Sequence, residues 1–101
     1  MHPLKVRRNH LHRLTDLPNI GPAMAADLQL LGYTAPLQLV GADPLDLYQR
    51  LCAATHARQD PCVLDTFISV CRFLDGETPR PWWDYTDERK QKWPLAPVKS
   101  D

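Results

Sequence analysis

Apolar residues recur every three or four positions along most of this sequence, which is the spacing of one face of an α-helix. No stretch alternates apolar and polar residues for long enough to predict a β-strand. The clearest apolar stripe follows Asp60-Pro61 and consists of Val63, Leu64, Phe67, Ile68, Cys71 and Leu74. The pattern therefore predicts an all-α fold, a single domain of about five short helices.

Caps and helix breakers mark where these helices begin and end. Asp43-Pro44 and Asp60-Pro61 each join a preferred N-cap residue to a proline that suits the first helical turn. The predicted helices span Leu4 to Leu14, Pro22 to Leu31, Ala35 to Val40, Leu45 to Ala54 and Cys62 to Asp75, with one more after Thr86. Pro94 and Pro97 are expected to stop regular structure in the tail. We divide the chain into a basic segment (1–13), a helical domain (14–78) and a Pro/Trp-rich tail (79–101).

Composition limits the classes of function. Hydrophobic residues make up 44% and charged residues 24% of the 101 residues, and the net charge is zero, so a soluble globule is expected. Zero net charge argues against a strong general binder of polyanions. The charge is uneven, however, because the first 13 residues contain Lys5, Arg7, Arg8 and Arg13 and no acid. This basic start is either a solvated terminus or a contact for phosphate.

Other features of the sequence bear on where the protein works. The N-terminus does not fit a signal peptide, because basic residues interrupt its apolar residues and no small-residue cleavage site follows. No apolar run is long enough to span a membrane. The odd number of cysteines, three, does not fit a disulfide framework. A reduced, cytoplasmic protein without membrane contact is therefore expected.

The stretch LPNIGPAMAADL, beginning at Leu17, contains a kinked turn that leads straight into a helix. Asn19 and Gly21 are the residues best able to take a positive φ, and Ile20 between them is expected to point inward. Such a turn gathers backbone N–H groups and a helix N-terminus, which favour an anion such as a DNA phosphate. The predicted phosphate-binding residues are Asn19, Ile20, Gly21, Ala23, Arg7, Arg8 and Arg13.

This stretch resembles the helix-hairpin-helix motif (a SAM-like fold) of DNA repair and recombination proteins. Ile20, Gly21, Pro22 and Ala25 fit that motif, Asn19 replaces its first glycine, and Ala23 stands where DNA-binding versions often carry Lys or Arg. The order of LTDLPNIGPAMAADLQLLGY, DPLDLYQRLC, RQDPCVLDTF and WWDYTDERK resembles the pathogenicity-locus family, small bacterial proteins often labelled mitomycin resistance proteins. The first half is also similar to the C-terminal domain of TfoX-type competence regulators.

The resemblance implies a DNA-associated role, and two functions follow from it and from the residues. One is weak, sequence-independent DNA binding without catalysis, linked to resistance to DNA damage by mitomycin. The other is a protein-interaction module that keeps the hairpin only as architecture. An enzyme is not expected, because no nucleophile, base and anion hole converge in the sequence, and no cofactor is expected either.

The cysteines offer a third kind of chemistry. Cys52, His56, Cys62 and Cys71 do not have the spacing of a compact zinc finger, so packed thiols are favoured over a metal site. Cys52 and Cys62 are a candidate thiol pair across the loop between two helices. Cys62 lies at a helix start, which lowers the pKa of a thiol, although the neighbouring Asp60 opposes that effect. Asp65 is expected on the polar face of its helix or as a capping carboxylate, with Arg58 or Arg72 as a partner.

The tail places Trp82, Trp83, Tyr85 and Trp93 among Arg80, Arg89, Lys90 and Lys92. Aromatic residues among basic ones stack on bases while the cations meet phosphates, but a small helical core also needs aromatic anchors. Structural anchoring is favoured for most of them. Neighbours in an extended segment face opposite ways, so one of Trp82 and Trp83 is expected to be exposed and to offer a surface to a partner.

Overall fold

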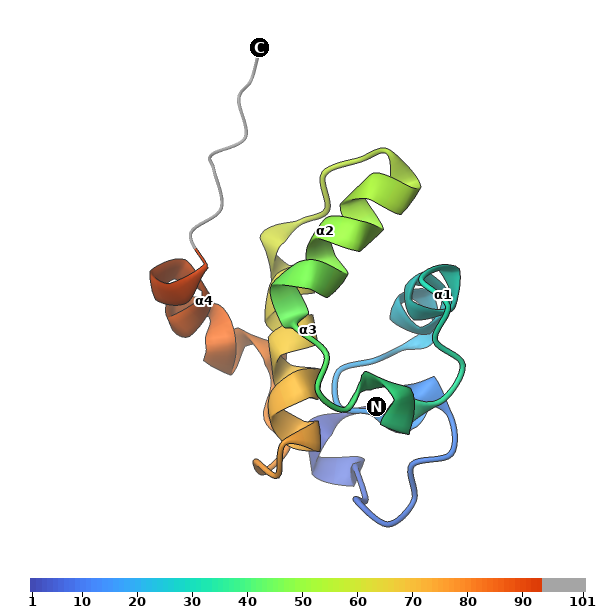
Figure 1. Ribbon diagram of the computed structural model, residues 1–101. Coiled ribbons are helices and arrows are strands. Elements are labelled where there is room, and N and C mark those ends of the chain that lie inside the picture. Colours follow the sequence, from blue (N-terminus) through green and yellow to red (C-terminus); the bar gives the residue numbers. More distant parts are fainter. Residues whose placement is uncertain (94–101) are drawn as a thin grey trace.

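The computed structural model describes residues 1–93, which form four α-helices and four short 3₁₀ turns (Figure 1). The α-helices are α1 (Pro22–Leu30), α2 (Pro44–Thr55), α3 (Pro61–Leu74) and α4 (Thr86–Lys92). The 3₁₀ turns are η1 (Pro3–Lys5), η2 (Leu14–Asp16), η3 (Pro36–Leu39) and η4 (Trp82–Tyr85). No strand occurs in residues 1–93, which confirms the predicted all-α class.

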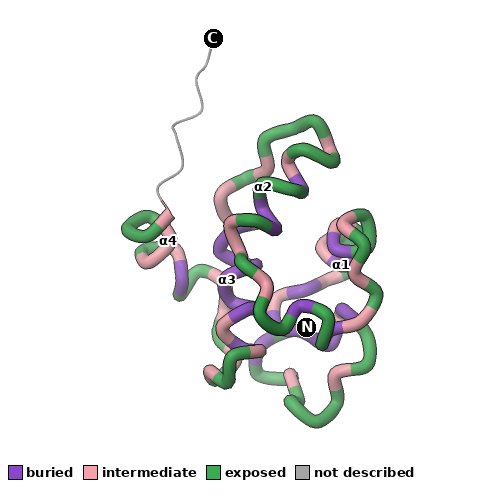
Figure 2. The backbone as a smooth tube through the Cα atoms, viewed as in Figure 1, coloured by how far each residue is buried: buried purple, intermediate pink, exposed green. Residues whose placement is uncertain are grey.

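Helix α3 is the centre of the fold, with α4 on one side and α1 on the other (Figure 1). The middle of its predicted stripe is buried, and Leu64, Phe67 and Ile68 are at most 1% exposed, whereas Val63 and Leu74 at its ends are partly buried. Helix α2 adds Leu47, Tyr48 and Leu51 to the same core. Figure 2 shows buried residues along α3 and exposed ones over much of the N-terminal loop. Within the described part of the chain, no helix is long and apolar enough to cross a membrane.

The predicted helix boundaries at the two Asp-Pro pairs are confirmed. Asp43 accepts a hydrogen bond from the Leu45 N–H, and Asp60 accepts one from the Cys62 N–H, both at 2.9 Å. Each aspartate thus satisfies one of the N–H groups that a helix start leaves without a partner. Gly32 and Gly76 follow α1 and α3 with φ of 98° and 111°, the left-handed geometry expected after a helix.

The helix predicted from Leu4 to Leu14 is wrong. Only η1 and η2 form in this region, and Leu4, which was to lie on its apolar face, is 90% exposed. The backbone N–H groups of His12 and Arg13 donate to the Asp16 carboxylate at 2.9 and 2.8 Å. These two bonds hold the chain in an open turn before η2, where a helix would have sent the same groups to its own backbone.

The pKa of Asp16 is lowered, mainly by the hydrogen bond from the Arg13 backbone. A carboxylate whose pKa falls on folding stabilises the protein above its unfolded pKa of about 3.9 and loses this contribution as pH falls through the folded value. We expect the urea midpoint of wild type to exceed that of Asp16→Asn most clearly near pH 6. The difference should narrow below about pH 4, because protonated Asp16 then resembles asparagine. A difference that stays constant from pH 6 to pH 2 would contradict this role.

The described part of the tail, residues 79–93, folds back onto α3. Tyr85 in η4 is 3% exposed, and the Arg89 Nε lies 2.8 Å from the Asp65 Oδ1 in α3. Thr86 is the first residue of α4 and not its cap, and its hydroxyl donates to the Asp65 Oδ2 at 2.8 Å. Arg72 of α3 also pairs with Glu88 of α4. The predicted stops at Pro94 and Pro97 lie outside the described residues.

Candidate functional site

The turn from Leu17 to Gly21 (the 17–21 turn) connects η2 to α1. Asn19 adopts φ of 65°, as predicted, and Ile20 is fully buried. Gly21 does not take a positive φ, because its φ of −94° and ψ of −175° are those of an extended N-cap residue. The element before the turn is a single 3₁₀ turn, so the helix-hairpin-helix resemblance rests on the turn and on α1.

The backbone N–H groups of the 17–21 turn divide into two sets. The Asn19 N–H donates to the Met1 carbonyl at 2.8 Å, and the Ile20 N–H donates to the Leu17 carbonyl at 3.3 Å. These bonds remove Asn19 and Ile20 from the predicted set of free donors. The N–H groups of Gly21 and Ala23 have no hydrogen-bond partner among residues 1–93, so these two remain available to an anion.

The Asn19 side chain fixes the turn to distant parts of the chain. Its Nδ2 donates to the Ser69 Oγ of α3 at 2.9 Å and to the Arg80 carbonyl at 2.8 Å. A left-handed asparagine is common in turns, but these two partners lie 50 and 61 residues away. Asn19 therefore positions the 17–21 turn beside the segment that leads into Trp82.

One hollow joins two groups of residues that the sequence singled out separately. It has a volume of about 400 Å³, and we call it the indole depression. Its lining consists of Met1, His2, Pro3, Asn19, Gly21, Trp82 and Trp83. The two indole rings meet edge to face, with centroids 5.5 Å apart and planes at 83°. Trp83 is 61% exposed and Trp82 is half-buried, as expected for neighbours that face different ways.

The predicted basic start is divided by the fold. Arg8 donates from Nη1 to the Phe73 carbonyl at 2.6 Å and from Nη2 to the Glu77 carbonyl at 2.8 Å. Its guanidinium also lies 4.1 Å from the centre of the Phe73 ring. Arg8 therefore caps the C-terminal end of α3, where carbonyls attract a cation, and its contact with phosphate stays a prediction.

The other three basic residues are exposed, as is Arg8. Lys5 and Arg7 line a second hollow of about 250 Å³ together with Met1 and His10 (the basic depression). Neither Lys5 nor Arg7 forms an ion pair within residues 1–93. Because Met1 lines both hollows, the basic depression adjoins the indole depression. Arg13 lies in neither and lines a separate hollow with Thr15 and Gln29.

All three cysteines are free thiols, so no disulfide joins Cys52 to Cys62, and their role as a thiol pair stays a prediction. The Cys52 sulfur accepts the Gln59 N–H at 3.4 Å. Burial, with a contribution from the adjacent Asp60 carboxylate, raises the pKa of the Cys62 thiol to about 11. Burial also raises the pKa of Cys71 to about 12. At Cys62, burial and the Asp60 carboxylate outweigh the helix start that was expected to lower the pKa of its thiol. The raised pKa values leave the thiols of Cys62 and Cys71 unreactive.

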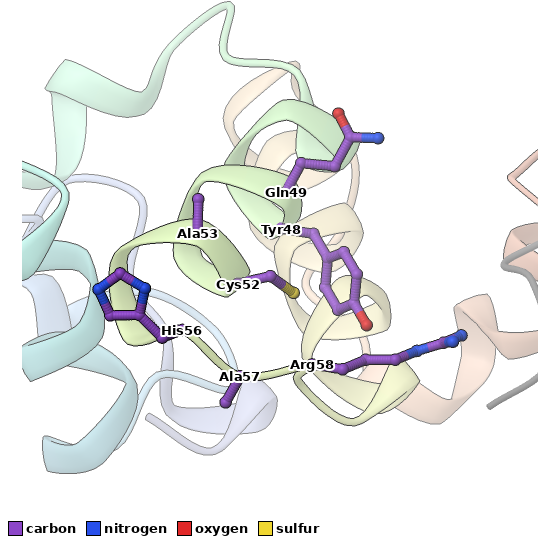
Figure 3. A pocket seen from close by; sticks show the side chains of 7 residues that line it. All are labelled: Tyr48, Gln49, Cys52, Ala53, His56, Ala57 and Arg58. Carbon is purple, nitrogen blue, oxygen red and sulfur yellow. The ribbon is translucent and has the colours of Figure 1, made fainter. Parts of the chain in front are cut away.

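Cys52 lines a hollow of about 550 Å³ at the end of α2, together with Tyr48, His56 and Arg58 (Figure 3). The sulfur of Cys52 points toward the Tyr48 ring, whereas the His56 ring points away from it (Figure 3). Cys52 and His56 are therefore not arranged as a thiol and its general base. No three His, Cys, Asp or Glu side chains lie close enough together to hold a metal ion anywhere in residues 1–93.

The architecture defines a small all-α protein whose 17–21 turn lies beside a pair of tryptophans. Residues 7–91 match the family model described as Pathogenicity locus (Cdd1), and the chain belongs to this family, as its sequence resemblance predicted. It is 45% identical over 78 residues to "Mitomycin resistance protein McrB" of Streptomyces lavendulae, a match that covers 77% of this chain and 74% of the relative. No solved structure matches the chain.

Proposed function

We propose that this protein binds DNA weakly, without sequence preference and without catalysing a reaction, and that this binding underlies a role in mitomycin resistance. The relative's name, mitomycin resistance protein, supports the link to resistance. The observation that carries the proposal is the shared edge of the indole depression and the basic depression at Met1. The two hollows that share Met1 thereby place the Gly21 N–H, two cations and two indole rings in one surface region.

Each of these groups suits a different part of a nucleic acid. The N–H groups of Gly21 and Ala23 and the side chains of Lys5 and Arg7 suit phosphate oxygens. No carboxylate lines either hollow, so no negative charge within them repels a phosphate. The small number of such donors and the zero net charge of the chain account for weak binding.

The test is fluorescence anisotropy of end-labelled single- and double-stranded DNA at 50 and 200 mM salt. With about three phosphates contacted, affinity should fall roughly 40-fold between these salt concentrations. Replacing both Lys5 and Arg7 by alanine should weaken binding to every sequence alike and lower the salt slope by about two. Lys90→Ala, an exposed lysine of α4 that forms no ion pair within residues 1–93, is the matched control and should change little.

Electrophoresis of the recovered DNA should show unchanged strands, as expected for a binding protein. Absence of binding even at 50 mM salt would overturn the proposal. The exposed Trp83 would then be better explained as a contact for a protein partner, the alternative that the sequence also allows.

A further inference from the structure

We propose that the indole depression holds an unpaired nucleobase stacked on Trp83, so that the protein prefers single-stranded or bulged DNA to an intact duplex. This inference rests on the proposed DNA binding and names the class of DNA that the same surface recognises. It starts from the division of roles among the aromatic residues of η4.

Tyr85 and Trp83 lie in the same 3₁₀ turn but have opposite surroundings. Tyr85 is 3% exposed and anchors η4 in the core, whereas Trp83 is 61% exposed. The core therefore takes its aromatic anchor from Tyr85 and leaves the larger indole at the surface. An indole held at the edge of a hollow presents a flat apolar ring to a ligand, and aromatic rings of this kind stack on bases of any sequence.

The hollow has room for a ring beside the indole. Its volume of about 400 Å³ lies within the range of about 300–1,000 Å³ typical of small-molecule sites. The two tryptophan planes stand at 83°, so the rings do not cover each other face to face. At Gly21, which also lines the hollow, an added Cβ would meet no atom within 4 Å, so the backbone there is not crowded.

Charge complementarity selects a nucleotide over an uncharged aromatic ligand. The basic depression meets the indole depression at Met1 and adds Lys5, Arg7 and His10 beside it. A base stacked on Trp83 would carry its phosphates toward the cations Lys5 and Arg7. Asp84 is an exposed carboxylate next to Trp83 in the sequence, but it lines neither hollow.

The pairing state of the DNA decides whether this stacking is available. In an intact duplex both faces of each base are covered by its neighbours, so only phosphate contacts form. An unpaired base adds stacking on Trp83, which for one base corresponds to roughly a ten-fold gain in affinity. The protein should therefore bind a bulged duplex and a single strand about ten-fold more tightly than a duplex of the same length.

The experiment compares three labelled DNAs of equal length by anisotropy: an intact duplex, a duplex with a three-nucleotide bulge, and a single strand. Trp83→Leu keeps an apolar side chain but removes the flat ring, and Trp83→Phe keeps a smaller ring. Trp83→Leu should reduce binding of the bulged and single-stranded DNAs to the level of the duplex. Trp83→Phe should retain most of the preference, and the Lys5/Arg7 double alanine variant should weaken all three DNAs alike. Unchanged urea midpoints would show that the variants fold.

The outcomes separate this inference from the proposed function. Equal affinity for the three DNAs, or a preference that Trp83→Leu leaves intact, would overturn the stacking site while salt-dependent DNA binding stands. Absence of binding to all three DNAs at 50 mM salt would overturn both.

Discussion

Arg89→Ala should lower the free energy of unfolding by about 3 kcal/mol. The Arg89 Nε lies 2.8 Å from the Asp65 Oδ1, and the Asp65 side chain is 1% exposed. Removing the guanidinium leaves a buried carboxylate whose remaining side-chain partner among residues 1–93 is the Thr86 hydroxyl. Breaking one partner of a buried pair is costly because the other charge stays out of water without compensation.

Urea unfolding followed by circular dichroism at pH 7 measures this cost. Lys90→Ala, one residue away and exposed, is the matched control and should change stability by less than about 0.5 kcal/mol. The double variant Asp65→Asn/Arg89→Met should be less destabilised than the sum of its single variants, since it removes both charges together. A loss below about 1 kcal/mol for Arg89→Ala would show that water reaches Asp65 and that the pair is in effect a surface pair.

The same pair connects stability to the candidate site. It holds α4 against α3, and η4 with Trp82 and Trp83 directly precedes α4. Arg72 with Glu88 adds a second bridge between these helices. We therefore expect variants that release α4 to disturb the indole depression as well. For this reason the test of stacking uses Trp83 itself, whose exposure makes its replacement nearly neutral for folding.

Local signals were enough to predict most of the helices. Asp43 and Asp60 act as caps, and the prolines after them occupy the first turns of α2 and α3. Two adjacent residues are therefore enough to predict each helix start. The stripe of α3 was likewise readable, because a central helix buries a continuous face. These features depend on residues a few positions apart.

The N-terminal helix failed as a prediction because side-chain contacts, one distant and one local, decide the path of this segment. Arg8 is bound to carbonyls of Phe73 and Glu77, more than 60 residues away, and Asp16 binds the backbone before η2. The spacing of the apolar residues does not predict either contact. The partner of Asp65 was missed for the same reason, since neither Arg58 nor Arg72 but Arg89, 24 residues away, forms the ion pair.

The candidate site was predicted in pieces but not as a whole. The 17–21 turn and the tryptophan pair each stood out by residue type, yet their convergence depends on the Asn19 side chain reaching the Arg80 carbonyl. Asparagine at a left-handed position is a local signal, whereas the identity of its partner is tertiary. A sequence can thus nominate groups that suit phosphate and base, while their meeting at one hollow comes only from the fold.

Ile20→Ala should lower the free energy of unfolding by about 3 kcal/mol, and Ile20→Val by about 1 kcal/mol. Ile20 is fully buried and points from the 17–21 turn into the core, so its truncation leaves a cavity between the turn and the helices. Gly21→Ala, one position later, is the matched control. The φ of −94° at Gly21 suits any residue, and a Cβ there meets no atom within 4 Å.

Urea unfolding of the three variants measures these costs, and we expect Gly21→Ala to stay within about 0.5 kcal/mol of wild type, because a small loss at the N-cap is offset by a less flexible unfolded chain. This order of effects would show that the buried Ile20 side chain, and not the glycine at position 21, holds the turn in place. A larger loss for Gly21→Ala than for Ile20→Ala would reverse that conclusion, since it would require a left-handed Gly21. The turn would then be closer to the hairpin first expected from the sequence, with a different set of N–H groups left without a partner.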